Sequence, residues 1–267
     1  MTQTTTAETF HVLHSGPEIL VLPNAWDAAS AALMADAGAK AVATSSAAVA
    51  WAHGYPDGDA LPMEKVVATV AEITRVVDAP VTCDFEGGYT DDLATLVDNI
   101  GRVIEAGAVG INLEDGGRNP DLHARKVEAA RKAAEKAGVD LFINARTDVY
   151  LKGLANGEAA EAETVRRAGL YAAAGASGIF VPGPSDEALI GRLAGAVALP
   201  LNIMLLPALP PAARLQALGV RRLSSATAPF RLAYATLIKG VAAYLATGEA
   251  GAFAAEGLPN LNARFTR

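Results

Sequence analysis

The 267-residue sequence contains a single cysteine, Cys83, and no long apolar run. One thiol excludes a framework of internal disulfides and is typical of a protein of the reducing cytosol. The most apolar long segment, residues 229–247, still carries Arg231 and Lys239 and is not expected to cross a membrane. The first eight residues are polar and lack the basic start and apolar centre of a secretion signal. We therefore expect a cytoplasmic protein without a membrane anchor.

Clusters of positive charge are also missing. The chain has 22 Lys and Arg residues against 29 Asp and Glu residues, which gives a formal net charge of −7 at pH 7. No basic block of the kind that binds nucleic acid occurs, so neither nucleic acid nor a membrane surface is an expected partner. Hydrophobic residues make up 51% of the chain, which is enough for a sizeable core. Because no linker or change of composition interrupts the chain, we expect one domain over residues 1–267.

A unit of helix, glycine and short apolar strand recurs along the chain. The five glycines that follow a predicted helix are Gly38, Gly107, Gly138, Gly175 and Gly219. Glycine readily adopts the left-handed conformation that ends many helices. Five copies of this unit indicate alternating helices and strands, and hence a parallel sheet.

Eight short strands, each followed by a helix-like segment, match a (β/α)8 TIM barrel in a chain of this size. The predicted strands are Ile19–Leu22, Ala41–Thr44, Val81–Asp84, Gly110–Leu113, Leu141–Asn144, Gly178–Val181, Leu201–Met204 and Arg222–Ser224. A doubly wound open sheet is the alternative. That fold favours a glycine-rich turn after its first strand, and residues 23–27 (Pro-Asn-Ala-Trp-Asp) do not form one.

Two carboxylates follow the third predicted strand, where Asp84 ends the strand and Glu86 comes two residues later. Strand side chains two residues apart point to the same face, so these carboxylates should share a face. Gly87 and Gly88 then allow a tight turn. Two carboxylates that point the same way repel each other unless a cation lies between them, and Mg²⁺ is a common partner. The alternative is a solvated strand end with two ordinary acids.

Polar side chains also follow the other predicted strands. In a TIM barrel the reacting groups lie at the carboxyl ends of the strands, so we expect Glu114 and Arg146 to converge with Asp84 and Glu86. An acidic cluster that faces one arginine suits a metal-bound anionic substrate, whose carboxylate pairs with the arginine. A structural salt bridge from Arg146 to Glu114 or Asp148 is the alternative. Further polar residues near strand ends are Asn24, Asp27, Thr44, Ser45, Ser46, Asp115, Asn144, Ser224 and Ser225.

Two other segments have features of functional or interface elements. The connection from Thr44 to Pro62 is long and contains several glycines and prolines. Loops of this length are often functional, so residues 51–61 are a candidate lid over the barrel mouth. The final predicted helix is alanine-rich and apolar nearly all round. Such a helix is buried, and we expect it to pack against another subunit.

Five motifs together resemble the isocitrate lyase/phosphoenolpyruvate mutase superfamily over essentially the whole chain. They are Leu22–Asp27 (LPNAWD), residues 45–57 with their GYPD ending, Asp84–Tyr89 (DFEGGY), Ile111–Asp115 (INLED) and Asn144–Asp148 (NARTD). The resemblance implies a barrel whose last helix swaps onto a neighbouring subunit, in a homodimer or homotetramer. The common chemistry of the family is stabilisation of a pyruvate enolate.

The resemblance also implies a set of ligands. Mg²⁺, or Mn²⁺ in its place, would be held by Asp84 directly, with the other acids helping directly or through waters. A small 2-oxo carboxylate would be gripped by Arg146 and by nearby backbone amides. The resemblance assigns metal binding to Asp84, Glu86 and Glu114, substrate binding to Ser45, Ser46, Ala47, Asp84 and Arg146, and catalysis to Arg146, Asp57 and Glu114.

The sequence departs from the family pattern in two places. Glu86 stands where the family usually has Asp, so a bound ion or its waters must shift. Lyase members carry a cysteine loop after the fourth strand, whereas residues 115–123 here (DGGRNPDLH) contain no thiol. Cys83 cannot replace it, because neighbouring strand residues face opposite sides and Cys83 should point into the helix layer.

The same loop leaves other roles open. Arg118 and Asn119 match the phosphoryl-binding loop of the mutases poorly. His123 is either a general acid or a residue on the solvated face of the next helix. We therefore expect a Mg²⁺-dependent enzyme that acts on the carbon–carbon bond of a 2-oxo acid, of oxaloacetate decarboxylase or lyase type. A phosphonopyruvate mutase or hydrolase, and a 2-oxo acid binding protein with little turnover, are the alternatives.

Overall fold

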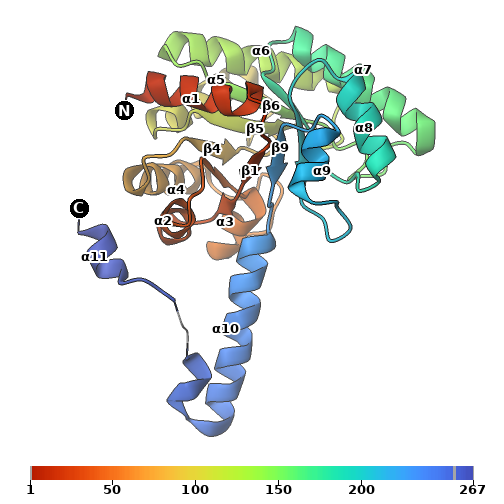
Figure 1. Cartoon of the computed structure of the whole chain (residues 1–267). Coiled ribbons are helices and arrows are strands. Elements are labelled where there is room, and N and C mark those ends of the chain that lie inside the picture. Colours follow the sequence, from red (N-terminus) through yellow and green to blue (C-terminus); the bar gives the residue numbers. More distant parts are fainter. Residues whose placement is uncertain (1, 255–256, 267) are drawn as a thin grey trace.

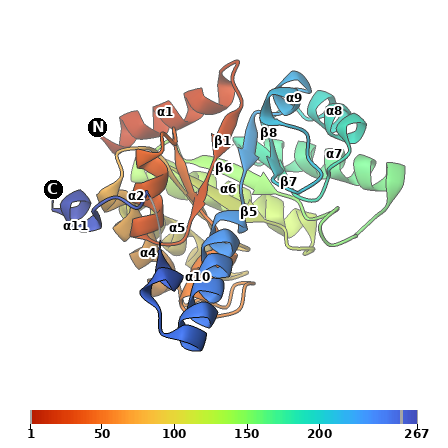
Figure 2. The ribbon, with the colours of Figure 1, turned by 60° about the horizontal axis from the view of Figure 1, so that its bottom comes forward.

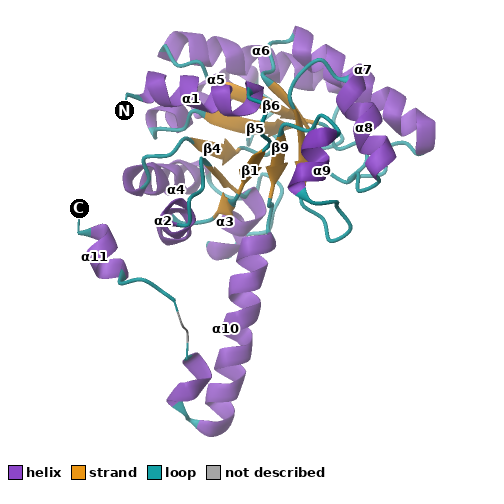
Figure 3. Cartoon of the chain, in the orientation of Figure 1, coloured by secondary structure: helices purple, strands orange, loops and turns teal. Residues whose placement is uncertain are grey.

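The computed structural model describes residues 2–254 and 257–266. The nine described strands are parallel and form one sheet, in the order β1-β9-β8-β7-β6-β5-β4-β3-β2. They occupy the centre of the molecule, and helices surround them (Figure 3). The strands are β1 (Leu20–Leu22), β2 (Asn24–Ala25), β3 (Val42–Thr44), β4 (Val81–Asp84), β5 (Gly110–Glu114), β6 (Phe142–Arg146), β7 (Gly178–Val181), β8 (Leu201–Met204) and β9 (Arg222–Ser224).

The two end strands of this sheet are joined by one residue, Pro23. β1 pairs with β9, for example Leu22 with Ser224, whereas β2 pairs with β3, for example Asn24 with Ala43. Proline has no amide hydrogen to donate to a ladder, so the strand is interrupted there. Because the chain itself connects the two edges, the sheet forms a nearly closed barrel. The predicted (β/α)8 barrel is confirmed, and the doubly wound alternative is wrong.

Helices alternate with the strands, as the repeated glycine unit predicts. All five glycines adopt positive φ angles, between 69° and 100°, at helix ends. Eight observed strands differ from the predicted ones by at most two residues at either end, and the ninth, β2, was not predicted. The helices are α1 (Gln3–Ser15), α2 (Ala28–Asp36), α3 (Ser46–Ala52), α4 (Met63–Val76), α5 (Leu93–Glu105), α6 (Pro120–Ala137), α7 (Gly157–Ala173), α8 (Glu187–Ala196), α9 (Ala212–Ala217), α10 (Ala228–Thr247) and α11 (Leu261–Phe265), with a 3₁₀ helix, η1, at Ala250–Phe253.

The apolar core lies between the strands and the helices. Side chains that point outward from the strands, such as Ile111 and Leu113, are fully buried there. Cys83 belongs to the same layer, because it lines one small pocket together with Val66 and Val70 of α4. The expected position of this thiol, turned toward the helices, is therefore confirmed.

Helix α1 covers the amino-terminal end of the barrel. Its Gln3 side chain donates to the carbonyls of Ile104 and Ala108 at 2.7 and 3.0 Å. Phe10 is fully buried and packs edge-on against Phe142 of β6, with ring centroids 5.5 Å apart. The barrel is thus closed at the end opposite to the carboxyl ends of its strands.

Helix α10 projects away from the barrel, as Figures 1 and 2 show. Leu232, Ile238 and Leu245 on this helix are 73%, 68% and 77% exposed. The chain then returns to α2, where Arg264 of α11 forms an ion pair of 2.8 Å with Asp36. Apart from contacts such as that of Tyr244 with Phe253 of η1, much of this apolar helix is exposed in the part of the chain that the structure describes. Its packing against another subunit stays a prediction. No helix in the described ranges has the length and apolar character needed to cross a membrane.

We expect Phe10→Ala to lower the free energy of unfolding by about 3–5 kcal/mol, because it removes a fully buried ring and leaves a cavity. Val12→Ala is the matched control on the same helix, since Val12 is 65% exposed. The control should change the free energy of unfolding by about 0.5 kcal/mol or less. Urea unfolding followed by circular dichroism measures both variants. Equal losses in the two would show that Phe10 does not anchor α1 on the barrel.

Candidate active site

The carboxyl ends of three adjacent strands bring Asp84, Glu114 and Arg146 together. These residues end β4, β5 and β6. Glu114 and Arg146 are register partners, and Arg146 Nη1 lies 2.7 Å from Glu114 Oε2. Both side chains are 15% exposed, so they remain reachable from the barrel mouth.

The Asp84 carboxylate is held by three donors among the described residues. The amide and the hydroxyl of Ser46 each donate to Oδ2 at 2.9 Å, and Asn112 Nδ2 donates to Oδ1 at 3.2 Å. Ser45 is the N-cap of α3, which places the Ser46 amide at the helix start. An ionised carboxylate offers about four acceptor positions, so one remains for a further ligand.

The backbone amides predicted to bind substrate have different partners. The Ser45 amide donates to the Ala25 carbonyl at 3.1 Å, and the Ser46 amide donates to Asp84. The Ala47 amide lies in the first turn of α3, where a helix offers no acceptor of its own. Of the three, the Ala47 amide is the one best placed to donate to a ligand.

Arg146 makes both salt bridges that the structural alternative predicts. Asp148 accepts from Nε at 2.7 Å and from Nη2 at 3.2 Å, and Glu114 lies beside Nη1. The guanidinium also lies over the ring of Phe180, 5.7 Å from its centroid. Since a guanidinium has five N–H groups, these pairings fix its plane and still leave donors for a substrate carboxylate. Its role as a substrate anchor stays a prediction.

Glu86 does not follow the strand alternation from which its direction was predicted. β4 ends at Asp84, and Glu86 itself has a left-handed backbone with φ of 48°. Its buried carboxylate accepts a bond of 2.9 Å from the Tyr89 hydroxyl and another from the Asp59 amide. Strand alternation therefore does not set the direction of Glu86, because the strand has ended before it. The charges of Asp84 and Glu86 both raise the pKa of Glu114, and a shared role of the two carboxylates at one ion stays a prediction.

The candidate lid is fastened to the loop after β4 through Asp59. Its Oδ1 accepts from the amides of Gly87 and Tyr89 at 3.0 and 3.1 Å, and Arg118 donates to its Oδ2 at 2.6 Å. Four non-glycine residues in the described ranges have positive φ, and three of them, Asp59, Glu86 and Tyr89, meet at this contact. Such strain persists only where surrounding bonds hold it. Opening of the lid stays a prediction.

The acids of the site shift one another's ionisation. Burial raises the pKa of Glu86 to about 7 and that of Glu114 to about 8, while the Asp59 amide and Arg146 act in the opposite direction. Asp57 lies in the lid, where partial burial and the neighbouring Asp84 raise its pKa. Negative charge at this mouth is therefore costly in the absence of a cation.

These residues fit a hard divalent ion that takes few protein ligands. In the part of the chain that the structure describes, no three His, Cys, Asp or Glu side chains form a cluster that could hold an ion by themselves. Mg²⁺ commonly takes one or two carboxylates and completes its octahedron with waters and substrate oxygens. Asp84 suits such a site because it has one remaining acceptor position. Glu114 lies close enough that the charge of Asp84 raises its pKa.

Several polar residues near the loop after β5 have structural roles. Asp115 is fully buried and accepts from Arg167 and Tyr171, each at 2.8 Å. His123 lies inside α6, is 1% exposed and packs edge-on against Tyr171, so its placement on a solvated face is wrong. Burial lowers the pKa of His123 to about 4, and burial raises the pKa of Cys83 to about 12. Neither residue, one in β4 and the other in α6, is therefore prepared for acid–base work beside this loop.

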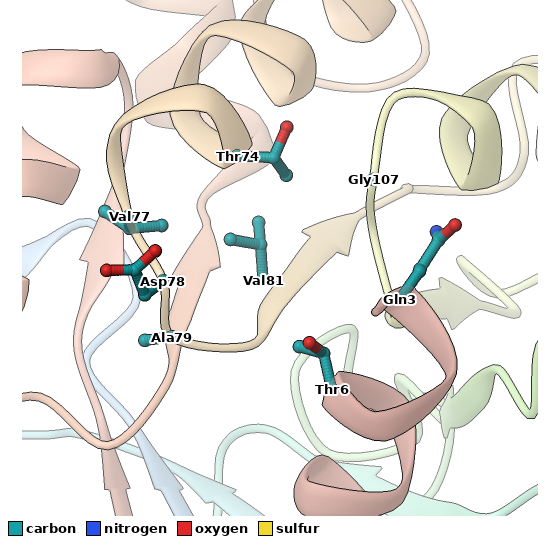
Figure 4. Close-up of a pocket in the computed structure, with 8 residues that line it drawn as sticks. All are labelled: Gln3, Thr6, Thr74, Val77, Asp78, Ala79, Val81 and Gly107. Carbon is teal, nitrogen blue, oxygen red and sulfur yellow. The ribbon is translucent and has the colours of Figure 1, made fainter. Parts of the chain in front are cut away.

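A groove of about 320 Å³ lies at the other end of the barrel, between α1 and the end of α4. Figure 4 shows Gln3 and Thr6 on one side and Thr74 and Asp78 on the other. Val81, which begins β4, also lines it, so the groove faces away from Asp84 at the end of the same strand. We assign the chemistry to the mouth at the carboxyl ends and not to this groove.

The pH dependence of stability should report on Glu86. Its pKa rises from 4.5 to about 7 on folding, so between these values the folded state binds the extra proton. The free energy of unfolding of the metal-free protein should therefore fall, by about 1–3 kcal/mol from this group, as the pH rises through that range. Glu86→Gln should remove this part of the fall, as denaturant unfolding in chelator would measure. An equal fall in variant and wild type would contradict the assignment.

Comparison with known proteins identifies relatives of this barrel. Residues 10–245 match the family described as phosphoenolpyruvate phosphomutase. A crystal structure from Burkholderia cenocepacia J2315, provisionally named a phosphonomutase, is 43% identical, with a TM-score of 0.85 over 89% of this chain and 99% of that one. An uncharacterized protein of Mycobacterium tuberculosis is 32% identical over 225 residues, 83% of each chain. An oxaloacetate decarboxylase of Ectopseudomonas mendocina is 31% identical over 174 residues, 63% of this chain and 59% of its own.

The family match covers most of the chain and includes every strand of the barrel. The motifs that carry the resemblance in the sequence lie at the barrel mouth, where Asp84, Glu114 and Arg146 meet. The chain therefore belongs to the isocitrate lyase/phosphoenolpyruvate mutase superfamily.

Proposed function

We propose that this protein is a Mg²⁺-dependent enzyme that acts on the carbon–carbon bond of a small 2-oxo carboxylate through a pyruvate enolate, with Mn²⁺ as an alternative ion. The main support is the Asp84 carboxylate, which three donors fix beside Glu114 and Arg146 with one acceptor position left. Relatives named 2-methylisocitrate lyase and oxaloacetate decarboxylase also support this chemistry. Among these reactions we favour the decarboxylation of oxaloacetate.

In this proposal Asp84 would hold the ion, and Glu86 and Glu114 would help directly or through waters. The ion, when bound, polarises the 2-oxo group and stabilises negative charge on its oxygen. The two glutamates have pKa values raised by burial, so nearby positive charge would favour their ionised forms.

The substrate carboxylate would pair with Arg146 and with the Ala47 amide. Asp148 holds the guanidinium plane, so a planar carboxylate meets donors that are already oriented. Asp57 approaches from the lid, which would exclude water when the site is filled. The charges of Asp84 and Arg146 both act on the pKa of Asp57, which supports a shared site for these residues.

Decarboxylation demands the least from the loop after β5. The electrons of the breaking bond move into the 2-oxo group, and CO₂ leaves without a general base. The enolate that remains then takes a proton from water at its carbon and becomes pyruvate, so neither step needs an acid or a base from the loop. Cleavage of an isocitrate-type substrate needs a base for the hydroxyl proton and an acid for the enolate carbon. Residues 115–123 contain no thiol, and His123 is buried with a lowered pKa. The loop therefore offers no evident acid–base pair for that cleavage.

Phosphonate chemistry is the second candidate, because a relative at 43% identity is provisionally named a phosphonomutase. Phosphoryl transfer needs a cradle for three oxygens, and Arg118, the cation of the loop after β5, is paired with Asp59 in this conformation. A 2-oxo acid binding protein with little turnover is the third, since the loop after β5 offers no evident general acid or base. Parallel assays with oxaloacetate, 2-methylisocitrate and phosphonopyruvate separate the three.

Two substitutions should separate metal binding from substrate binding. Asp84→Ala should abolish measurable Mg²⁺ binding, because it removes the direct ligand. Arg146→Lys should weaken binding of pyruvate or oxalate by about tenfold or more while changing Mg²⁺ affinity little, since lysine cannot pair bidentately. Titration calorimetry measures both ligands. Normal binding by Asp84→Ala would mean that the metal site is placed wrongly, and normal oxalate binding by Arg146→Lys would give Arg146 a purely structural role.

We expect Mg²⁺-dependent release of pyruvate from oxaloacetate at a rate above that of free Mg²⁺, with little cleavage of 2-methylisocitrate. Free metal ions also catalyse this decarboxylation, so Asp84→Ala at the same Mg²⁺ concentration is the control. A coupled assay for pyruvate measures both. If wild type and Asp84→Ala release pyruvate at one rate, the decarboxylase proposal fails and the binding protein becomes the better interpretation.

We also propose a homodimer or homotetramer in which α10 packs against a neighbouring copy. The apolar face of α10 is exposed in the single chain, and Val21 on the outer face of β1 is 54% exposed where no helix covers it among the described residues. A helix from a second copy could cover such apolar surface.

The double substitution Leu232→Glu and Ile238→Glu should convert the oligomer into monomer, because it places two charges on that apolar face. Lys239→Glu, on the same helix, is the matched control and should leave the mass unchanged. Light scattering after gel filtration measures the mass of each. A monomeric wild type, or a double variant that keeps the wild-type mass, would contradict this proposal.

A further inference from the structure

Arg222 is a fully buried arginine in the interior of the barrel, at the start of β9. Its Nε donates to Ser224 Oγ at 3.0 Å and its Nη2 donates to Asn112 Oδ1 at 3.2 Å. Its Nη1 is buried without a hydrogen-bond partner among the described residues. No described Asp or Glu forms an ion pair with it. A TIM barrel normally fills this position with an apolar side chain, so the arginine needs a physical reason.

Among the described acids, Asp84 is the one whose charge acts on Arg222. Burial lowers the pKa of Arg222 to about 9, and the negative charge of Asp84 acts against that decrease. A guanidinium keeps its proton at neutral pH even when it is buried. A buried cation without a counter-charge is strongly unfavourable, so Arg222 and Asp84 stabilise each other across the side chain between them, which is Asn112.

The orientation of the Asn112 amide follows from its neighbours. Its Oδ1 accepts from Arg222 Nη2 and from Asn144 Nδ2, at 3.2 and 2.9 Å. Its Nδ2 then points to Asp84 Oδ1 at 3.2 Å. A flipped amide would place its hydrogens against the donor-only guanidinium and its oxygen against the carboxylate. Arg222 thus permits one orientation only, the one that donates to Asp84.

We propose that Arg222 is a positioning residue for the Asp84 site, acting through Asn112 to hold the Asp84 carboxylate with its remaining acceptor position toward the barrel mouth. The nature of the ligand rests on the proposed function, whereas the orientation of Asp84 does not. A residue that only fills the barrel would affect folding stability and leave ligand affinity unchanged. A positioning residue affects ligand affinity beyond its effect on stability.

The test compares Arg222→Met with Arg131→Met. Arg131 is a control of the same type, because it donates to the Gly175 carbonyl and to Ser177 at the amino-terminal end of the barrel. In calorimetry with MgCl₂, Arg222→Met should bind Mg²⁺ at least about tenfold more weakly than the wild type. Arg131→Met should change the Mg²⁺ affinity by less than about twofold. At saturating Mg²⁺ the kcat for oxaloacetate should recover toward wild type, while the Mg²⁺ concentration for half-maximal rate stays raised.

The route through Asn112 gives a second readout. Mg²⁺ affinity of the double variant Arg222→Met/Asn112→Ala should equal that of Asn112→Ala alone, since the arginine acts through the residue already removed. Additive losses would overturn the route. If Arg222→Met does not fold, Arg222→Gln replaces it as a smaller neutral side chain, with at least about fivefold weaker Mg²⁺ binding expected.

Crystal structures of the wild type and the variant test the positioning role without any metal. Loss or rotation of the Asn112–Asp84 contact in the variant supports it. An unchanged Asn112–Asp84 contact in the variant overturns the positioning role. If the wild type binds Mg²⁺, an unchanged Mg²⁺ affinity in the variant overturns it too. If the wild type binds no Mg²⁺, the proposed function fails, and the two crystal structures still show whether Arg222 orients Asn112 and Asp84.

Discussion

A carboxylate can select one ligand geometry only if its own direction is fixed, and the bonds to Asp84 provide this. Ser46 donates twice from the start of α3, and Asn112 donates from the neighbouring strand. The first contact depends on the N-cap at Ser45 that begins the helix there, and the second on the register of β4 with β5. Two ordinary local features, a helix cap and a strand register, therefore orient the group on which the proposed chemistry depends.

At the contact between the lid and the loop after β4, strained backbone is offset by hydrogen bonds. Asp59, Glu86 and Tyr89 adopt backbone conformations that cost roughly 1–3 kcal/mol each in a non-glycine residue. The bonds among them, together with the ion pair from Arg118, offset that cost. The Glu86 carboxylate reaches the lid, where it accepts from the Asp59 amide. Glu86 thus adds one bond to the contacts by which Asp59 joins the lid to the loop after β4.

The sequence predicts the barrel well because its signals are local. Each helix-ending glycine fixes a boundary, and strand ends place Asp84, Glu114 and Arg146 at one mouth. Reasoning from neighbouring residues in the sequence fails where a tertiary contact determines the direction or burial of a side chain. Glu86 turns toward the lid after the strand has ended, and His123 is buried beneath a neighbouring helix. Asp59 and Arg222 carry no motif at all, because their partners lie far away in the chain and only the folded barrel brings them together.

A crystal structure with Mg²⁺ and oxalate tests the proposed site most directly, because oxalate resembles the planar enolate of pyruvate. We expect an ion bound to an Asp84 oxygen, with oxalate completing its coordination and one oxalate carboxylate paired with Arg146. The lid should lie over both, still joined to Glu86 through the Asp59 amide. An ion bound elsewhere, or oxalate that contacts neither Asp84 through the ion nor Arg146, would contradict this placement of metal and substrate.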